Sequence, residues 1–319
     1  MKYNHVQLDI KTYINSLYKD GLKKSDILSK KELENTILNI GIFKVKGYIK
    51  AFRNKLSEYT IDDLLELYRI DRQLSLNMLS LTSQIEIKLK SFLIETVYSL
   101  TDNPFFYLLK DNYKEDYNLP IDSLYDWEVK EYSIKQKNEI YPHYRDYYLK
   151  HYDFKSNTTE YLNSKLLIYL DEERDINYPP FHYFIESASL GTLINIISKL
   201  NIGNNDILKL IARKFHFYQE NVFLTSLLRL KELRNRCAHN GRIFNRNFRG
   251  LRAFGLHKIF RTTIYEHKLI DVYFTLHFLL DNTDKFNNIE KLISSFETDN
   301  LSECSDNMKS FVISIMKTR

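Results

Sequence analysis

Glycine and proline, the residues that most often interrupt regular structure, are scarce in this chain: its 319 residues include 8 glycines and 5 prolines. A chain with so few interruptions forms long elements. Apolar residues recur at helical spacing, as at Ile10, Tyr13, Ile14 and Leu17, and this period predicts helices. We therefore expect an all-α protein built as a helical bundle.

The helical pattern divides the chain into three parts. Residues 1–57 are expected to form an N-terminal helical extension, although the alternation in Ile42–Lys46 also allows a strand there. Residues 58–280 are expected to form the helical core, and Thr60 is a good N-terminal cap for its first helix. Residues 281–319 are expected to form a C-terminal helical segment.

Residues 101–178 differ in composition, and we expect them to be an aromatic-rich subregion inserted into the core. Aliphatic residues become rare there, and tyrosines cluster between Tyr141 and Tyr152. Such a cluster can stack unpaired bases, although packing against the bundle is the commoner role. After Pro179-Pro180 the pattern predicts further helices at 181–200, 206–218, 221–239, 255–280 and 287–316.

Composition and spacing argue against several classes of protein. The two cysteines, Cys237 and Cys304, are too few for a disulfide framework or a zinc site and fit a reducing cytoplasm. No glycine-rich phosphate loop occurs, and the spacings of the His and Cys residues give no metal site, so we expect neither a metal nor another cofactor. The longest apolar run, Leu269–Leu280, is interrupted by Asp271 and His277 and is too short to span a bilayer. We therefore expect a cytoplasmic protein that does not enter a membrane.

The positive charge of the chain is concentrated in one basic stretch. Residues 221–265 carry ten Lys and Arg residues and one acid, Glu232, whereas the rest of the chain carries 36 basic and 40 acidic residues. Most of the ten are arginines, which suit phosphate recognition better than lysines do. The basic stretch therefore predicts a polyanion partner, RNA or DNA, with a merely solvated basic face as the alternative.

An arginine and a histidine five positions apart lie within this stretch, at Arg234 and His239, and Asn235 follows the arginine. A histidine exchanges protons near neutral pH and a guanidinium grips phosphate, which together are enough for cleavage of RNA without a metal ion. Spacing alone is weak evidence, because three other Arg/His pairs in the chain have similar spacing. The alternative is an ordinary helix end before Asn240-Gly241, with basic side chains near the last carbonyls.

Helical geometry limits how Arg234 and His239 can cooperate. Five residues along a regular helix turn the two side chains about 140° apart. Either the helix breaks before His239, or a second copy of the element completes the site, as the two-fold interface of a homodimer can do. We therefore expect a homodimer.

The segment Leu233–Asn245 resembles the signature of the Abi abortive-infection proteins, the AbiD/AbiF-like family of the HEPN superfamily of helical ribonucleases. Other stretches resemble further blocks of that family in the family's order; they are Gly47-Tyr48 with Phe52-Arg53, Leu67–Leu74, Ile85–Lys90 and Pro180–Gly191. The resemblance covers residues 5–280, and Leu233–Asn245 is its specific part. It departs from many relatives at Lys88 and Lys90, where those have arginine.

The resemblance implies a HEPN-like helical bundle that dimerises, cleaves RNA without a metal ion and arrests the growth of an infected bacterial cell. It assigns the catalytic positions to Arg234, Asn235 and His239. It also implies that a protein or RNA antidote can restrain the activity.

Other charged residues complete the expected site. The arginines expected to bind flanking phosphates of the RNA are Arg236, Arg242, Arg246 and Arg249. Glu86, Glu186 and Asp71 could orient His239 or pair with Arg234. Ion pairs between these acids and lysines or arginines close to them in sequence are at least equally expected.

We therefore expect an endoribonuclease effector of anti-phage abortive infection, of the toxin type. Attack of the ribose 2′-OH on the adjacent phosphorus would leave a 2′,3′-cyclic phosphate. The alternative is a non-catalytic RNA-binding or protein-interaction module on the same fold. Cleavage of labelled RNA in the presence of a chelator separates the two.

Overall fold

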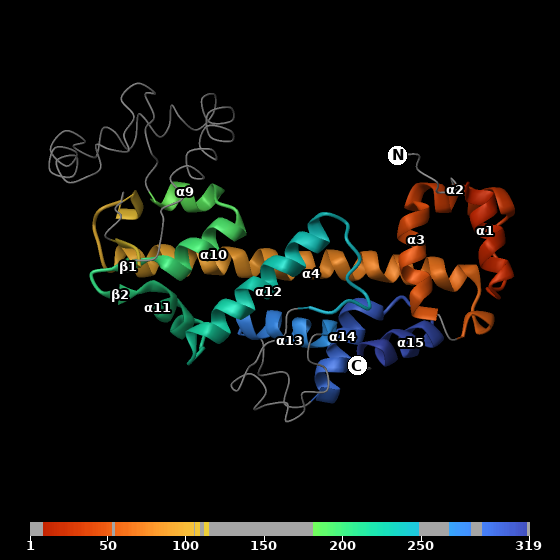
Figure 1. Cartoon of the computed structure of the whole chain (residues 1–319). Coiled ribbons are helices and arrows are strands. Elements are labelled where there is room, and N and C mark those ends of the chain that lie inside the picture. The colour runs from red at the N-terminus through yellow and green to blue at the C-terminus, as the bar shows by residue number, and fades with distance from the viewer. Residues whose placement is uncertain are drawn as a thin grey trace, which may run out of the picture. The chain divides into compact units, whose positions relative to one another are not determined.

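The computed structural model describes residues 9–52, 55–104, 106–108, 112–114, 181–248, 268–281 and 289–317, and most of them are helical (Figure 1). The all-α prediction is confirmed. Within these ranges the one sheet is a short antiparallel pair, β1 (Asn201–Ile202) and β2 (Asn205–Asp206), with Asn201 opposite Asp206. The described residues fall into two compact units, one within residues 1–88 and 217–319 and the other within residues 89–216.

The first unit begins with three helices, α1 (Ile10–Lys19), α2 (Lys30–Ile40) and α3 (Ile42–Ile49). Gly41 joins α2 to α3 with a φ of 92°, a left-handed conformation that glycine adopts without strain. The segment 42–46 is helical, so the strand that its alternation allowed does not form. On α3 the buried residues are Val45 and Tyr48, three positions apart, and this spacing gives the helix one inward face.

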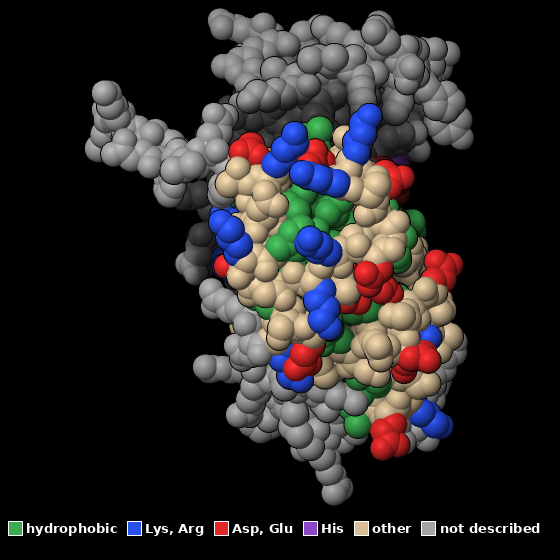
Figure 2. Space-filling view, turned by 90° about the vertical axis from the view of Figure 1, so that its right-hand side faces the viewer, with side chains coloured by type: hydrophobic (Ala, Val, Ile, Leu, Met, Phe, Trp, Pro, Cys, Tyr) green, Lys and Arg blue, Asp and Glu red, His purple; other side chains and the backbone are tan. Residues whose placement is uncertain are grey.

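The N-terminal helices and the loop between α1 and α2 also carry exposed apolar side chains. Ile27, Leu38 and Phe43 are 80%, 63% and 88% exposed. Figure 2 shows the side of the molecule that lies on the right of Figure 1, where Lys and Arg side chains border apolar ones. Two short 3-10 turns, Lys50–Phe52 and Leu56–Glu58, lead from α3 to the next helix.

The long helix α4 (Ile61–Tyr98) has 38 residues, of which 61–88 belong to the first unit. Thr60 caps it as predicted: the Asp63 N–H donates to the Thr60 hydroxyl at 3.2 Å, and the Thr60 N–H donates to the Asp63 carboxylate at 2.7 Å. The inward face of α4 is apolar, with Leu67, Leu74 and Met78 fully buried. Asp71 lies on this same buried face.

The first unit is completed by α12 (Glu220–Ala238), α13 (Leu269–Leu279), α14 (Ile289–Leu301) and α15 (Asp306–Lys317). The predicted helix at 287–316 is therefore two helices, and residues 255–267 of the one predicted at 255–280 lie outside the described ranges. Arg229 of α12 is fully buried and pairs with Asp271 of α13 at 2.7 Å. This arginine of the basic stretch thus joins two helices inside the protein and is not a surface cation.

The second unit contains the end of α4, the 3-10 turn Phe106–Leu108, α9 (Phe181–Ser187), α10 (Leu190–Lys199) and α11 (Ile207–Lys214). Aromatic rings fill part of its core: Tyr107 stacks on Phe184 with ring centroids 5.0 Å apart. Most of the predicted insertion at 101–178, including the tyrosines at 141–152, lies outside the described residues. In the described part of the chain, every helix is too short or too polar to cross a membrane.

Candidate functional site

The predicted Arg–His element lies at the C-terminal end of α12, in the first unit. The helix ends where Asn240-Gly241 predicted: the Gly241 N–H donates to the Arg236 carbonyl at 2.7 Å, and the Asn240 N–H donates to the Cys237 carbonyl at 3.2 Å. This pair of bonds is a Schellman motif, in which Asn240 takes the left-handed conformation with a φ of 53°. A β-carbon on Gly241 would lie 3.1 Å from the Arg236 carbonyl oxygen, so glycine permits the close approach.

The three residues expected to be catalytic stand on this helix end, and none of them has a polar partner among the described residues. Arg234 is half-buried, and Asn235 and His239 are exposed. In the described part of the protein their side chains make no hydrogen bond or ion pair, whereas many polar side chains around them are paired. Within the described ranges, the end of α12 therefore carries a guanidinium, an amide and an imidazole that are not used in internal pairs.

The helix does not break before His239. The His239 N–H still donates to the Asn235 carbonyl at 3.0 Å, which is a regular helical bond. His239 thus leaves the helix about where a helical residue would, about 140° around the axis from Arg234. Arg234 and His239 could meet at one phosphate through a break in the helix or through a second copy of the chain. The structure does not contain the helix break.

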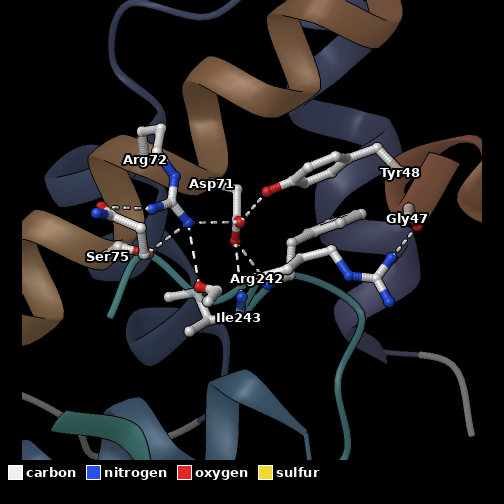
Figure 3. A network of polar contacts seen from close by, with 10 residues as sticks. Gly47, Tyr48, Asp71, Arg72, Ser75, Arg242 and Ile243 are labelled. Atoms are coloured by element: carbon white, nitrogen blue, oxygen red, sulfur yellow. Dashed lines mark hydrogen bonds and ion pairs between the residues drawn. The ribbon is translucent and has the colours of Figure 1, made fainter. Parts of the chain in front are cut away.

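A buried carboxylate holds the turn that follows His239 (Figure 3). Asp71 of α4 is fully buried, and its Oδ1 accepts the backbone N–H groups of Ile243 at 3.1 Å and of Phe244 at 2.7 Å. Its Oδ2 accepts a hydrogen bond from the Tyr48 hydroxyl and pairs with Arg72 at 3.2 Å. The ion pair with Arg72 confirms the local pairing expected for Asp71 from the sequence. The bonds to the backbone of the turn were not foreseen.

Arg72 holds the same turn by its other donors. Its Nη1 donates to the Asn240 side-chain oxygen at 3.2 Å, and its Nη2 donates to the Gly241 carbonyl at 3.1 Å. The Nη2 also lies 3.4 Å from the hydroxyl of Ser75. Two neighbouring residues of α4, Asp71 and Arg72, therefore hold the turn Asn240–Phe244 through its backbone and through the Asn240 side chain.

Helix α3 contacts the turn from its other side. Burial, reinforced by the adjacent Asp71, raises the pKa of Tyr48 far above its ordinary value, so its hydroxyl stays a donor. Arg242 donates to the Gly47 carbonyl, and its guanidinium lies 5.7 Å from the centre of the Tyr48 ring. Burial lowers the pKa of Arg242, with Arg246 adding to the effect. These contacts join α3 to the segment that carries the Arg–His element.

The arginines expected to bind flanking phosphates occupy different surroundings. Arg236 bonds Glu232 one turn earlier at 2.9 Å, and Arg242 is held by α3. Arg246 is exposed, and Arg249 lies outside the described residues. The arginines of the basic stretch therefore do not form one uniformly exposed surface, because some of them are paired with other groups of the protein.

The two glutamates proposed as supporting residues lie on different helices. Glu86 is half-buried on α4. Glu186 is exposed on α9 in the second unit, where its carbonyl accepts a bond from Lys90 at 2.7 Å. Their roles stay predictions. Among the described residues, no three His, Cys, Asp or Glu side chains are grouped as a metal site would require.

The sequence contained one signal that Asp71 is buried and holds other parts of the chain. Asp71 is a charged residue four positions after the buried Leu67 and three before the buried Leu74, so it interrupts an apolar face. A carboxylate in such a position needs buried donors. The sequence could not name these donors, because Ile243 and Phe244 are 172 and 173 residues away.

Comparison with known proteins gives one result. The family model of Abi-like proteins matches residues 35–245, about two thirds of the 319 residues, and the match ends at the last residue of the segment 233–245. No curated protein and no solved structure matches the chain. The matched range includes α3, Asp71 and the Arg–His element, and the chain therefore belongs to the family of Abi-like proteins.

Proposed function

We propose that this protein is a metal-independent endoribonuclease effector of bacterial anti-phage abortive infection, with the toxin-like activity of a HEPN site. Membership of the Abi-like family supports the abortive-infection role. The observation that carries the ribonuclease proposal is the helix end of α12, where Arg234, Asn235 and His239 have no polar partner in the described part of the chain.

The proposed reaction is an intramolecular transesterification of RNA. The ribose 2′-oxygen forms a bond to the adjacent phosphorus, the bond to the 5′-oxygen breaks, and the products are a 2′,3′-cyclic phosphate and a free 5′-OH. His239 takes the proton of the 2′-OH or gives one to the departing 5′-oxygen. Arg234 binds the non-bridging oxygens and stabilises their developing charge, an effect often worth about 3 kcal/mol per donor. Asn235 orients the ribose or the imidazole.

A homodimer brings the two side chains to one phosphodiester. Within one chain they point about 140° apart, because α12 stays helical up to His239. A two-fold axis beside the end of α12 places Arg234 of one copy opposite His239 of the other. Phosphates on either side of the cut bind Arg246 and Arg249, with Arg236 and Arg242 adding positive charge. A protein or RNA antidote that covers this end of α12 would silence the enzyme.

The test is cleavage of end-labelled RNA in EDTA by the parent and by His239→Ala. Loss of an acid–base group predicts a rate lower by roughly 10²- to 10⁴-fold, with RNA binding retained. His216→Asn is the control, because it removes an exposed histidine elsewhere and asparagine tolerates the left-handed φ of 61° at that position. DNA of the same sequence stays intact because it lacks the 2′-OH. Equal cleavage by His239→Ala, or equal cleavage of DNA, contradicts the proposal.

A further inference from the structure

The turn Asn240–Phe244 is fastened by a carboxylate that is removed from water. Asp71 is fully buried, and its two oxygens have four donors: two backbone amides of the turn, the Tyr48 hydroxyl and the Arg72 guanidinium (Figure 3). A buried carboxylate without such donors would be strongly disfavoured. The position of the turn and the burial of Asp71 therefore depend on each other.

The donors come from three separate parts of the first unit. Tyr48 belongs to α3, Arg72 belongs to α4, and the two amides follow α12. A second link between α3 and the turn is the bond from Arg242 to the Gly47 carbonyl. The turn begins directly after His239, so a shift of the turn moves the backbone that carries the imidazole.

We propose that Tyr48 and Asp71 are positioning residues of the Arg–His site, and that α3 controls this site through the turn Asn240–Phe244. The inference rests on the proposed ribonuclease function. Neither residue contacts the RNA. Asp71 fixes the turn, Tyr48 fixes Asp71, and a displacement of α3 from α4 releases both.

The expected effect is on the rate of the chemical step. A catalytic group displaced by about 1 Å can cost about 100-fold in rate, because proton transfer depends steeply on geometry. RNA affinity depends mostly on phosphate contacts, and these tolerate small movements of the turn. We call the contacts of Tyr48 and Asp71 that hold the turn Asn240–Phe244 the clamp. Loosening the clamp should therefore lower kcat and leave KM nearly unchanged.

Tyr48→Phe is the most selective variant. It removes one hydroxyl donor to Asp71 and keeps the ring against which Arg242 and Tyr68 pack at 5.7 and 5.8 Å. Tyr273→Phe is its matched control. Tyr273 is also buried and also donates to a carboxylate, that of Asp299, but this pair joins α13 to α14 and not to the turn.

The experiment compares the full-length parent and both variants by amide hydrogen exchange and by RNA cleavage kinetics. We expect Tyr48→Phe to speed the exchange of the Ile243 and Phe244 amides by about 10-fold or more, and Tyr273→Phe to leave both amides unchanged. We expect kcat of Tyr48→Phe to fall about 10-fold, with KM within about 2-fold of the parent. Asp71→Asn, which keeps an acceptor for the amides but no charge, should show the same kcat defect.

The two readouts separate this inference from the ribonuclease proposal. Unchanged exchange at Ile243 and Phe244 in Tyr48→Phe overturns the clamp, whatever the activity. Faster exchange with an unchanged kcat overturns the positioning role. A parent that binds RNA but never cleaves it refutes the ribonuclease function and with it the catalytic role of the clamp, whereas the exchange data still decide whether α3 holds the turn.

Discussion

Buried polar groups in this protein hold backbone and helices together, while the residues proposed for chemistry are left accessible. Asp71 satisfies both its oxygens with donors from three elements, and Arg229 is fully buried against Asp271. His239 and Asn235, by contrast, are exposed at the end of α12. Side chains that make no polar contact with the described part of the chain can bind a ligand without first breaking such contacts.

Cys237 lies next to the candidate site, and its buried thiol makes the stability of the fold depend on pH. Burial raises the pKa of its thiol to about 11, from an ordinary value of 9.0. Between pH 9 and 11 the unfolded chain loses the thiol proton while the folded chain keeps it, so the free energy of unfolding falls as the pH rises through this range. Urea unfolding at pH 8 and pH 10.5 should show a smaller decline for Cys237→Ala than for the parent. An equal decline would show that this thiol is not buried as described.

At the scale of elements, helix ends with a clear capping residue were predictable, whereas the contacts between helices were not. Thr60 and Asn240-Gly241 mark the start of α4 and the end of α12 because capping depends on residues within a few positions. The role of Asp71 depends on amides more than 170 residues away, and the burial of Arg229 depends on a partner 42 positions later. Sequence patterns alone do not determine such pairings.

The ion pair between α12 and α13 predicts a double-mutant effect. Arg229→Met leaves Asp271 buried without its guanidinium and should destabilise the fold by about 3–5 kcal/mol. Adding Asp271→Leu removes the orphaned charge and should recover most of that loss. Chemical denaturation of the parent, both single variants and the double variant gives the coupling free energy between Arg229 and Asp271. Additive effects of the two substitutions would mean that the pair is not formed.

At the scale of the whole molecule, the family of the chain and the geometry of α12 together limit how the proposed site can be built. The chain belongs to the Abi-like family, and α12 keeps Arg234 and His239 about 140° apart within one chain. The sequence predicted the helical class, the end of α12 and the family. The clamp that holds the turn after His239 became visible only in three dimensions, because α3, α4 and the end of α12 each supply part of it.

Mixing two inactive variants tests the proposed composite site most directly. Arg234→Ala and His239→Ala are purified separately, allowed to exchange subunits and assayed on labelled RNA in EDTA. If each site takes its arginine from one copy and its histidine from the other, heterodimers keep one intact site, and the mixture should regain about a quarter of the parent activity. A mixture as inactive as its two components, beside a dimeric and active parent, contradicts the composite site.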